Sequence, residues 1–298
     1  MSRRPDLGPS GLVVVDKPAG WTSHDVVAKS RGLLGTRKIG HAGTLDPDAT
    51  GVLLLGVGKA TRLLRYLSPL GKAYVGEVVF GVETSTLDSS GEVTATHHMA
   101  DLTLDRVTEA AANFVGPINQ IPPMVSAVKV DGRRLHELAR QGIEVEREPR
   151  SVTIHRLEVR DGPAGEPLVF EVEVECSSGT YIRTLAADLG HALGGGAHLR
   201  NLRRTSVGPF TLAEAVPLES LSPDLVRPMT DVVTHLDPVL ADAATAEAVT
   251  MGKVLDRGAL EAQGEGPWAV VDAEGSLLAV YEPFRGDTVK PAVVLVAR

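Results

Sequence analysis

Residues 40–51 read GHAGTLDPDATG, and they run directly into the apolar segment VLLLGV at residues 52–57. A polar, glycine-punctuated stretch beside a hydrophobic run is typical of a loop held on a buried strand. The proline after Asp46 restricts that residue to extended backbone geometry, while Gly43 and Gly51 permit tight turns on either side. Taken alone, the stretch is most simply a surface turn, in which Asp-Pro is common.

The flanking segments predict a sheet with helices packed against it. Residues 11–16 (GLVVVD) read as a buried strand, and Thr22 with Asp25 offers a cap for a helix that ends at Gly35. Alternating segments rich in β-formers predict further strands. The other expected strands are residues 52–57, 72–81, 151–159 and 168–176, and the other expected helices are 59–66, 104–114, 135–140 and one from about Arg183.

Composition sets the broad class. At 298 residues, with 43% hydrophobic and 23% charged residues, the chain fits one large domain plus one small one. No apolar run of about 18 residues is present, and the N-terminus lacks the apolar segment of a secretion signal. A lone cysteine, Cys176, excludes an internal disulfide framework and a zinc-finger type of metal site. We therefore expect a cytoplasmic protein without membrane spans or a metal.

Charge is unevenly distributed along the chain. The formal net charge is −8, yet residues 1–75 hold eleven basic and only five acidic side chains. Two later segments, 133–150 and 198–208, are also rich in arginine. Basic faces on an acidic protein suggest contact with a polyanion such as RNA. The alternatives are uneven charge without a function and a solvated surface hairpin at 133–150.

The pattern changes at about His235 to short strands separated by glycine turns. The expected strands are residues 268–272, 277–281 and 289–296. Such a change predicts a small β-rich domain with its own core.

Several motifs follow one another in a defined order. They are DKP at 16–18 within 12–21, the stretch 41–51, the segment 122–140, GTYIR at 179–183 within 176–190, and LRR at 202–204. In this order they resemble the bacterial tRNA pseudouridine synthase B family, which acts on uridine 55 of the tRNA T-arm. The resemblance covers roughly residues 10–215.

The resemblance implies an α+β fold. A pseudouridine synthase catalytic domain over residues 1–230 would surround a mixed, largely antiparallel sheet, with an RNA-gripping insertion at residues 122–150. Residues 235–298 would form a small PUA-like domain, although their acidic composition argues against strong RNA contact there. The implied partner is tRNA, engaged at the T-arm stem-loop, and the protein is expected to be a monomer.

The resemblance also implies roles for individual residues. Asp46 would be the catalytic carboxylate, Tyr74 would stack on the target base, and Arg183 would complete the catalytic set. The implied substrate-binding residues are Lys17, His41, Lys129, Tyr181, Leu202, Arg203 and Arg204. Of these, His41 could fill the space that the flipped base leaves or contact a phosphate, and Lys17 could support the loop or contact a phosphate.

Pseudouridine formation breaks the N1–C1′ bond, rotates the uracil and rejoins it through C5, so it requires no cofactor or metal. Asp46 could attack C1′ or C6, or take a proton from C2′. A buried carboxylate tends to protonate unless a cation opposes this, so an ion pair between Asp46 and Arg183 is expected. Either Tyr74 or Asp46 could remove the C5 proton.

Two other classes of function remain at this stage. The chain could be an RNA-binding or RNA-folding protein with an inactive pocket, against which the joint presence of Asp46, Tyr74 and Arg183 speaks. It could also be a hydrolase that cleaves the glycosidic bond without rejoining it. An assay with tRNA that carries tritium at C5 of uridine separates the three classes. Tritium release supports the isomerase, binding without release supports the RNA-folding protein, and free uracil supports the hydrolase.

Overall fold

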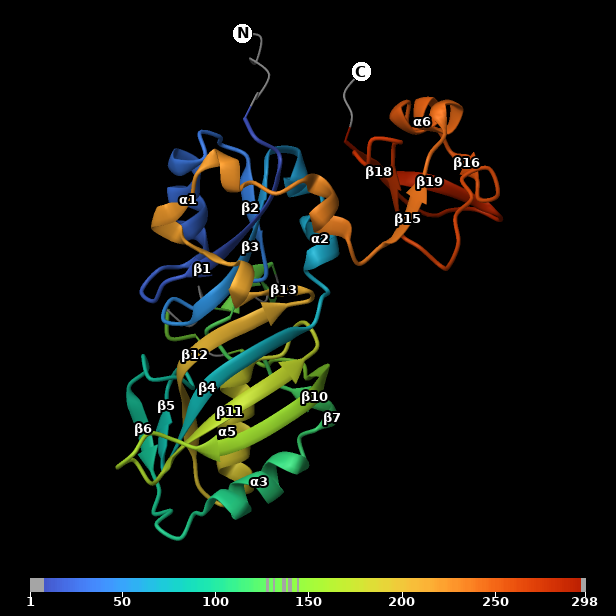
Figure 1. Ribbon diagram of the computed structural model, residues 1–298. Coiled ribbons are helices and arrows are strands. Elements are labelled where there is room, and N and C mark those ends of the chain that lie inside the picture. The colour runs from blue at the N-terminus through green and yellow to red at the C-terminus, as the bar shows by residue number, and fades with distance from the viewer. Residues whose placement is uncertain are drawn as a thin grey trace.

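The structure is a computed structural model, and it places a long sheet at the centre of the chain (Figure 1). For residues 129, 130 and 134 only the backbone is described. The described residues are 8–126, 129–130, 132–135, 138, 141–143 and 145–295.

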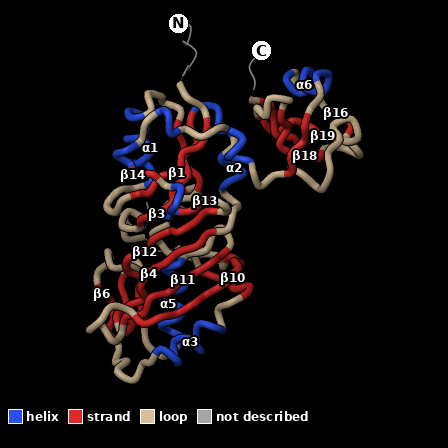
Figure 2. The backbone as a smooth tube through the Cα atoms, viewed as in Figure 1, coloured by secondary structure: helices blue, strands red, loops and turns tan. Residues whose placement is uncertain are grey.

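The central sheet has ten strands and is mixed. Figure 2 draws its strands in red. Its order is β14 (Val216–Pro217), β1 (Gly11–Lys17), β3 (Thr50–Val57), β12 (Ala197–Val207), β4 (Lys72–Phe80), β11 (Val169–Cys176), β10 (Arg150–Asp161) and β7 (Gly116–Gln120), with β2 (Ile39–Ala42) beside β3 and β13 (Phe210–Thr211) beside β12. The pairs β1–β14 and β3–β12 are parallel and the rest are antiparallel. The prediction of an α+β fold with a mixed, largely antiparallel sheet is confirmed.

The contact between β3 and β12 is short and close, and it depends on a glycine. Gly51 pairs with Arg204 and has a φ of +101°. A Cβ on Gly51 would lie 2.1 Å from the Arg204 carbonyl oxygen, so no other residue fits without a backbone shift. The loop that precedes β3 is thereby held beside β12.

Helices cover this sheet where the capping signals predicted them. In α1 (Ser23–Leu33), Thr22 and Asp25 form a reciprocal capping box, and Thr103 caps α3 (Leu104–Ala112). Apolar side chains of α3 and α5 (Ile182–Ala192) pack against β4, β10 and β11, whereas those of α1 pack against β1 and β3. The expected helix at 59–66 is a 3-10 turn, η1 (Gly58–Arg62), followed by α2 (Leu64–Leu67). The expected helix at 135–140 lies largely outside the described residues.

Strand β12 was missed, because residues 198–208 were interpreted as a basic surface patch. The segment instead lies at the middle of the sheet between β3 and β4. Its pairing with β4 shifts register between Arg200 and Arg203, and Asn201 there has a positive φ of 52°. This bulge interrupts the alternation of apolar and polar residues by which a strand is recognised.

Short elements complete the chain. Two hairpins are formed by β5 (Val82–Thr84) with β6 (Val93–Thr96) and by β8 (Lys129–Val130) with β9 (Arg133–Arg134). The connection to the C-terminal part contains four 3-10 turns, which are η2 (Leu212–Glu214), η3 (Leu218–Ser220), η4 (Pro223–Leu225) and η5 (Met229–Val233).

The C-terminal part has its own five-stranded sheet. Its order is β15 (Asp237–Leu240), β17 (Trp268–Val271), β18 (Leu277–Pro283), β19 (Thr288–Val294) and β16 (Leu255–Asp256), with α6 (Ala243–Thr250) beside it. The three predicted strands are confirmed, while β15, β16 and α6 were not predicted. An apolar cluster joins this part to the central sheet through residues that include Leu67, Phe210, Val280 and Val293. Among the described residues, no helix is long and apolar enough to cross a membrane.

Candidate active site

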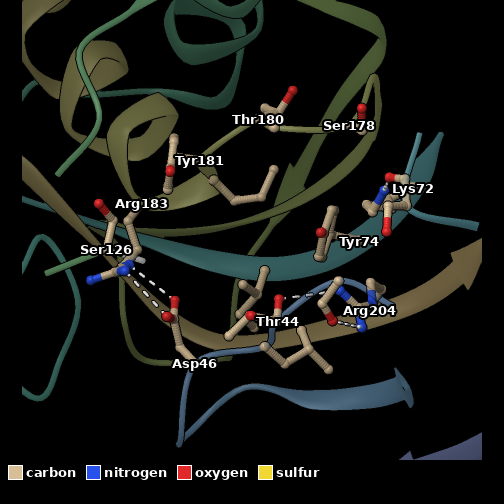
Figure 3. Close-up of a pocket in the computed structure, with 16 residues that line it drawn as sticks. Thr44, Asp46, Lys72, Tyr74, Ser126, Ser178, Thr180, Tyr181, Arg183 and Arg204 are labelled. Atoms are coloured by element: carbon tan, nitrogen blue, oxygen red, sulfur yellow. Dashed lines mark hydrogen bonds and ion pairs between the residues drawn. The ribbon is translucent and has the colours of Figure 1, made fainter. Parts of the chain in front are cut away.

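A cavity of about 280 Å³ opens where the β2–β3 loop, the start of β4 and the turn before α5 meet (Figure 3). The loop supplies Asp46 and β4 supplies Tyr74, whereas β12 closes the space with Leu202. The lining residues are Gly43, Thr44, Leu45, Asp46, Ser68, Lys72, Tyr74, Ser126, Ser178, Gly179, Thr180, Tyr181, Ile182, Arg183, Leu202 and Arg204. Segments that are far apart in the sequence therefore share one site.

Asp46 and Arg183 form a two-contact ion pair within this cavity. Arg183 Nε lies 3.0 Å from Asp46 Oδ2, and Nη2 donates to Oδ1 at 3.2 Å. The Arg183 side chain is 5% exposed. A fork of two parallel N–H···O contacts fixes both the position and the plane of the carboxylate. The ion pair expected from the sequence is confirmed.

Arg183 is itself held by three further acceptors. Its guanidinium donates to the carbonyls of Thr86 at 3.0 Å and Val125 at 2.7 Å, and Nη1 lies 3.4 Å from Asp88 Oδ2. Asp88 in turn accepts the Thr86 hydroxyl at 2.6 Å. Sequence reasoning placed Asp88 only in a polar turn, because nothing in that turn shows that it reaches Arg183.

The Asp46 side chain is 39% exposed, so it is only partly removed from water, and this partial burial affects its ionisation. Desolvation raises the pKa of the Asp46 carboxyl above its ordinary 3.8, Arg183 opposes this, and Asp88 adds to the rise. Desolvation is therefore the larger effect, and the ion pair offsets only part of it. The result is a carboxylate that is more basic than a solvated aspartate.

Tyr74 and Leu202 form an apolar wall of the cavity. Tyr74 is 7% exposed, and burial raises the pKa of its phenol while the nearby Arg204 lowers it. Leu202 packs over Gly76, which is on the same face of β4 as Tyr74, and a Cβ on Gly76 would lie 3.3 Å from its methyl. The structure thus places both predicted residues at the cavity.

Lys17 does not face the cavity, which corrects its assignment as a substrate-binding residue. The side chain is fully buried, and its ammonium donates to three carbonyls, those of Pro18 at 2.9 Å, Trp21 at 2.6 Å and Pro47 at 2.8 Å. All three of its N–H groups are therefore used within the protein. Lys17 anchors the loop one residue after Asp46, which is the supporting role that the sequence left open.

The expected basic patch at Arg203 and Arg204 is contradicted for Arg204, which is not at the surface. Arg204 is fully buried, and its guanidinium donates to the carbonyls of Val52 at 2.7 Å, Gly43 at 3.1 Å and Thr44 at 3.4 Å. It therefore supports the β2–β3 loop from beneath. Arg203 is partly exposed, but it pairs with Asp16 at 2.7 Å and donates to the Thr50 hydroxyl at 3.1 Å.

The remaining predicted residues are placed differently. Tyr181 lines the cavity, and its backbone N–H and carbonyl both bond to the Gln120 amide, at 3.0 and 3.2 Å. His41 lies on β2, outside the cavity lining, edge-to-face with His24. Burial and the positive neighbours lower the pKa of His41 to about 4, so it is neutral near pH 7. The Lys129 side chain lies outside the described residues.

Lys72 lines the cavity and was not singled out from the sequence. It donates to the carbonyls of Leu70 at 2.6 Å and Ser68 at 3.1 Å. Burial lowers the pKa of its ammonium to about 8, and Arg204 adds to this effect. Asp48, by contrast, is exposed, as expected of a solvated loop residue. Within the described part of the chain, no cluster of three or more His, Cys, Asp or Glu side chains could hold a metal ion.

Comparison with known proteins identifies the class to which this fold and site belong. Residues 31–182 match the TruB family pseudouridylate synthase N-terminal domain, and residues 183–246 match the tRNA pseudouridylate synthase B C-terminal domain. The chain belongs to the TruB family of pseudouridylate synthases. Members of this class are isomerases, as the sequence motifs led us to expect.

Similar proteins are known as sequences and as structures. The tRNA pseudouridine synthase B of Arthrobacter sp. (strain FB24) is 47% identical over 297 residues, which cover 96% of each chain. That of Thermobifida fusca (strain YX) is 45% identical over 296 residues, covering 95% of this chain and 98% of its own. In a crystal structure of a Cbf5-Nop10-Gar1 complex, one chain is 27% identical with a TM-score of 0.75, covering 99% of this chain and 91% of that one.

Proposed function

We propose that this enzyme converts uridine 55 in the T-arm of tRNA to pseudouridine, with Asp46 as the catalytic carboxylate. The observation that carries the proposal is the Asp46–Arg183 ion pair inside a cavity bordered by Tyr74 and Leu202. Relatives that match nearly the full length are named tRNA pseudouridine synthase B, which supports tRNA as the substrate. One similar structure is of an RNP bound to a substrate RNA, at 25% identity and a TM-score of 0.73.

The reaction leaves the composition of the nucleotide unchanged. The N1–C1′ bond breaks, the uracil turns, a C5–C1′ bond forms, and the proton that C5 carried leaves while N1 gains one. Asp46 is the carboxylate beside the reacting sugar and base, and Arg183 holds both of its oxygens in a fixed plane. Such preorganisation lets the carboxylate react without first reorienting.

The target uridine must leave the stacked T-loop before it reaches the cavity. Tyr74 and Leu202 offer the flipped base an apolar wall that replaces the lost stacking. Stacking on an aromatic ring is worth about 1–3 kcal/mol per base. Tyr181 borders the same cavity from the turn before α5.

We assign removal of the C5 proton to Asp46 rather than to Tyr74. Burial raises the pKa of the Tyr74 phenol above its ordinary 10, so the ring is neutral and a poor base near pH 7. Burial also raises the pKa of Asp46, which makes that carboxylate a stronger base than a solvated aspartate. Tyr74 then acts through its ring, by packing.

The test uses tRNA transcripts that carry tritium at C5 of uridine. The enzyme should release tritium from a transcript with uridine 55 and none beyond background from a matched transcript with cytidine at that position. Release from both transcripts would contradict position 55. Free uracil would indicate a hydrolase, and binding without release would indicate an RNA-folding protein.

A further inference from the structure

The cavity is electrostatically divided. At one end, Asp46 and Arg183 line the cavity, and Arg183 also contacts Asp88, which does not line it. Two carboxylates thus share one guanidinium, which leaves a net negative charge. Toward the other end lie Lys72 and Arg204, and within the described part of the chain neither forms an ion pair with a carboxylate. A nucleotide that enters this cavity brings both a base and a charged phosphate, so the two ends are suited to different parts of it.

Lys72 is placed to act at the mouth rather than in the interior. Its stem packs against Gly43, where an added Cβ would lie 3.5 Å from Lys72 Cε. The neighbouring lining residues Ser68 and Gly179 are exposed, and Ser178 and Thr180 lie on the same side of the cavity (Figure 3). A phosphodiester that remains outside while its base enters would meet this rim.

Within the part of the chain that the structure describes, Lys72 has two acceptors and keeps one N–H group for a ligand. An ammonium has three donors, and two of them bond to the carbonyls of Ser68 and Leu70. These contacts fix the direction of the side chain without neutralising its charge. Partial burial also strengthens the attraction between the ammonium and an anion relative to a fully solvated pair.

We propose that Lys72 binds a backbone phosphate flanking the flipped uridine, and that it thereby sets which nucleotide of the loop enters the cavity. The proposal rests on the proposed function for its RNA ligand. Placement at Lys72 keeps the phosphate away from the Asp46 and Asp88 carboxylates, which would repel it. The contact also gives the nucleotide a fixed point opposite the reacting carboxylate.

The test is a double-mutant cycle, in which a change in the protein and a change in the RNA are made separately and together and the affinity is measured each time. The probe is a T-arm stem-loop in which either phosphate flanking the target uridine is replaced by an uncharged methylphosphonate. Lys72→Gln removes the charge but keeps a donor for the Ser68 or Leu70 carbonyl. Lys29→Gln is the matched control, because Lys29 is exposed on α1 and does not line the cavity.

We expect one methylphosphonate to weaken binding by wild type and by the control Lys29→Gln alike, by roughly three- to tenfold. The same replacement should change binding by Lys72→Gln by less than about twofold. The affinity of Lys72→Gln for the unmodified RNA should fall by a larger factor than its rate of tritium release at saturating RNA. Equal losses in wild type and Lys72→Gln at both phosphates would overturn the proposal, as would a slowed saturating rate with unchanged affinity.

The measurement separates this proposal from the proposed function. Binding is read without turnover, so the cycle decides the role of Lys72 even if wild type releases no tritium. If wild type does release tritium and the cycle shows no coupling, only the Lys72 proposal fails. Circular dichroism checks that Lys72→Gln is folded, and Lys72→Arg, which keeps the charge, should retain the coupling if Lys72→Gln does not fold.

Discussion

Replacing Arg183 by lysine tests how far the site depends on a guanidinium. Arg183 makes two contacts with Asp46, one with Asp88 and two with backbone carbonyls. Lysine keeps the positive charge but has three donors and no planar fork. It can therefore serve at most three of these five acceptors, and it cannot hold both oxygens of Asp46 in one plane.

The expected magnitude follows from the contact that is lost to Asp46. A hydrogen bond to a charged group contributes about 1.5–3 kcal/mol. If this loss falls on the transition state, the rate decreases by roughly 10- to 150-fold, since each 1.36 kcal/mol is tenfold. The assay is tritium release in a single turnover with enzyme in excess, alongside a binding measurement with the same tRNA.

Arg160→Lys is the matched control, because Arg160 is an exposed arginine that pairs with Glu158 and Glu173, and none of the three lines the cavity. It should release tritium at the wild-type rate. We expect Arg183→Lys to lose rate much more than affinity for tRNA. A wild-type rate in Arg183→Lys would refute the reasoning, and so would a loss confined to affinity.

Three other predictions concern residues that surround the site. Lys17→Met should lower the free energy of unfolding, measured in urea, by about 2 kcal/mol. It leaves three buried carbonyls unpaired at a cost of about 1–3 kcal/mol each, and the removal of a buried charge offsets part of that cost. Unchanged stability would contradict this. Gln120→Leu removes both hydrogen bonds to the Tyr181 backbone. The single-turnover rate of tritium release should therefore fall by roughly tenfold, with less change in affinity for tRNA. A wild-type rate would show that these two hydrogen bonds do not position Tyr181 for the reaction. His41 should titrate near pH 4 by NMR, and because its folded pKa is lowered from 6.5, stability should decline as pH falls from 6.5 toward 4; a midpoint near 6.5 would contradict its burial.

Much of the secondary structure could be predicted because its signals are local. The capping box of Thr22 and Asp25 marked the start of α1, and the alternation of residues 72–81 marked β4. The Asp46–Arg183 pair was also predictable, since an arginine in the first turn of a helix opposes the helix dipole and calls for an anion.

Other features depend on contacts that no local pattern records. Lys17 and Arg204 carry the positive charge that is typical of phosphate-binding residues, but the fold surrounds each with backbone carbonyls. Asp88 and Gln120 reach the site only because β7 and the turn after β5 come to lie beside the start of α5. A basic side chain on a strand can therefore bind RNA or support a loop, and only its neighbours distinguish these roles.

The central claim is that the Asp46 carboxylate performs the chemistry. Asp46→Asn keeps the size of the side chain and an oxygen that can accept from Arg183, but it removes the charge and the basicity. The direct measurement is single-turnover tritium release from tRNA labelled at C5 of uridine, with Asp48→Asn, an exposed aspartate two residues away, as the control. We predict that Asp46→Asn still binds the tRNA but releases no tritium above background, while Asp48→Asn releases it as wild type does. Tritium release by Asp46→Asn at the wild-type rate would contradict the claim.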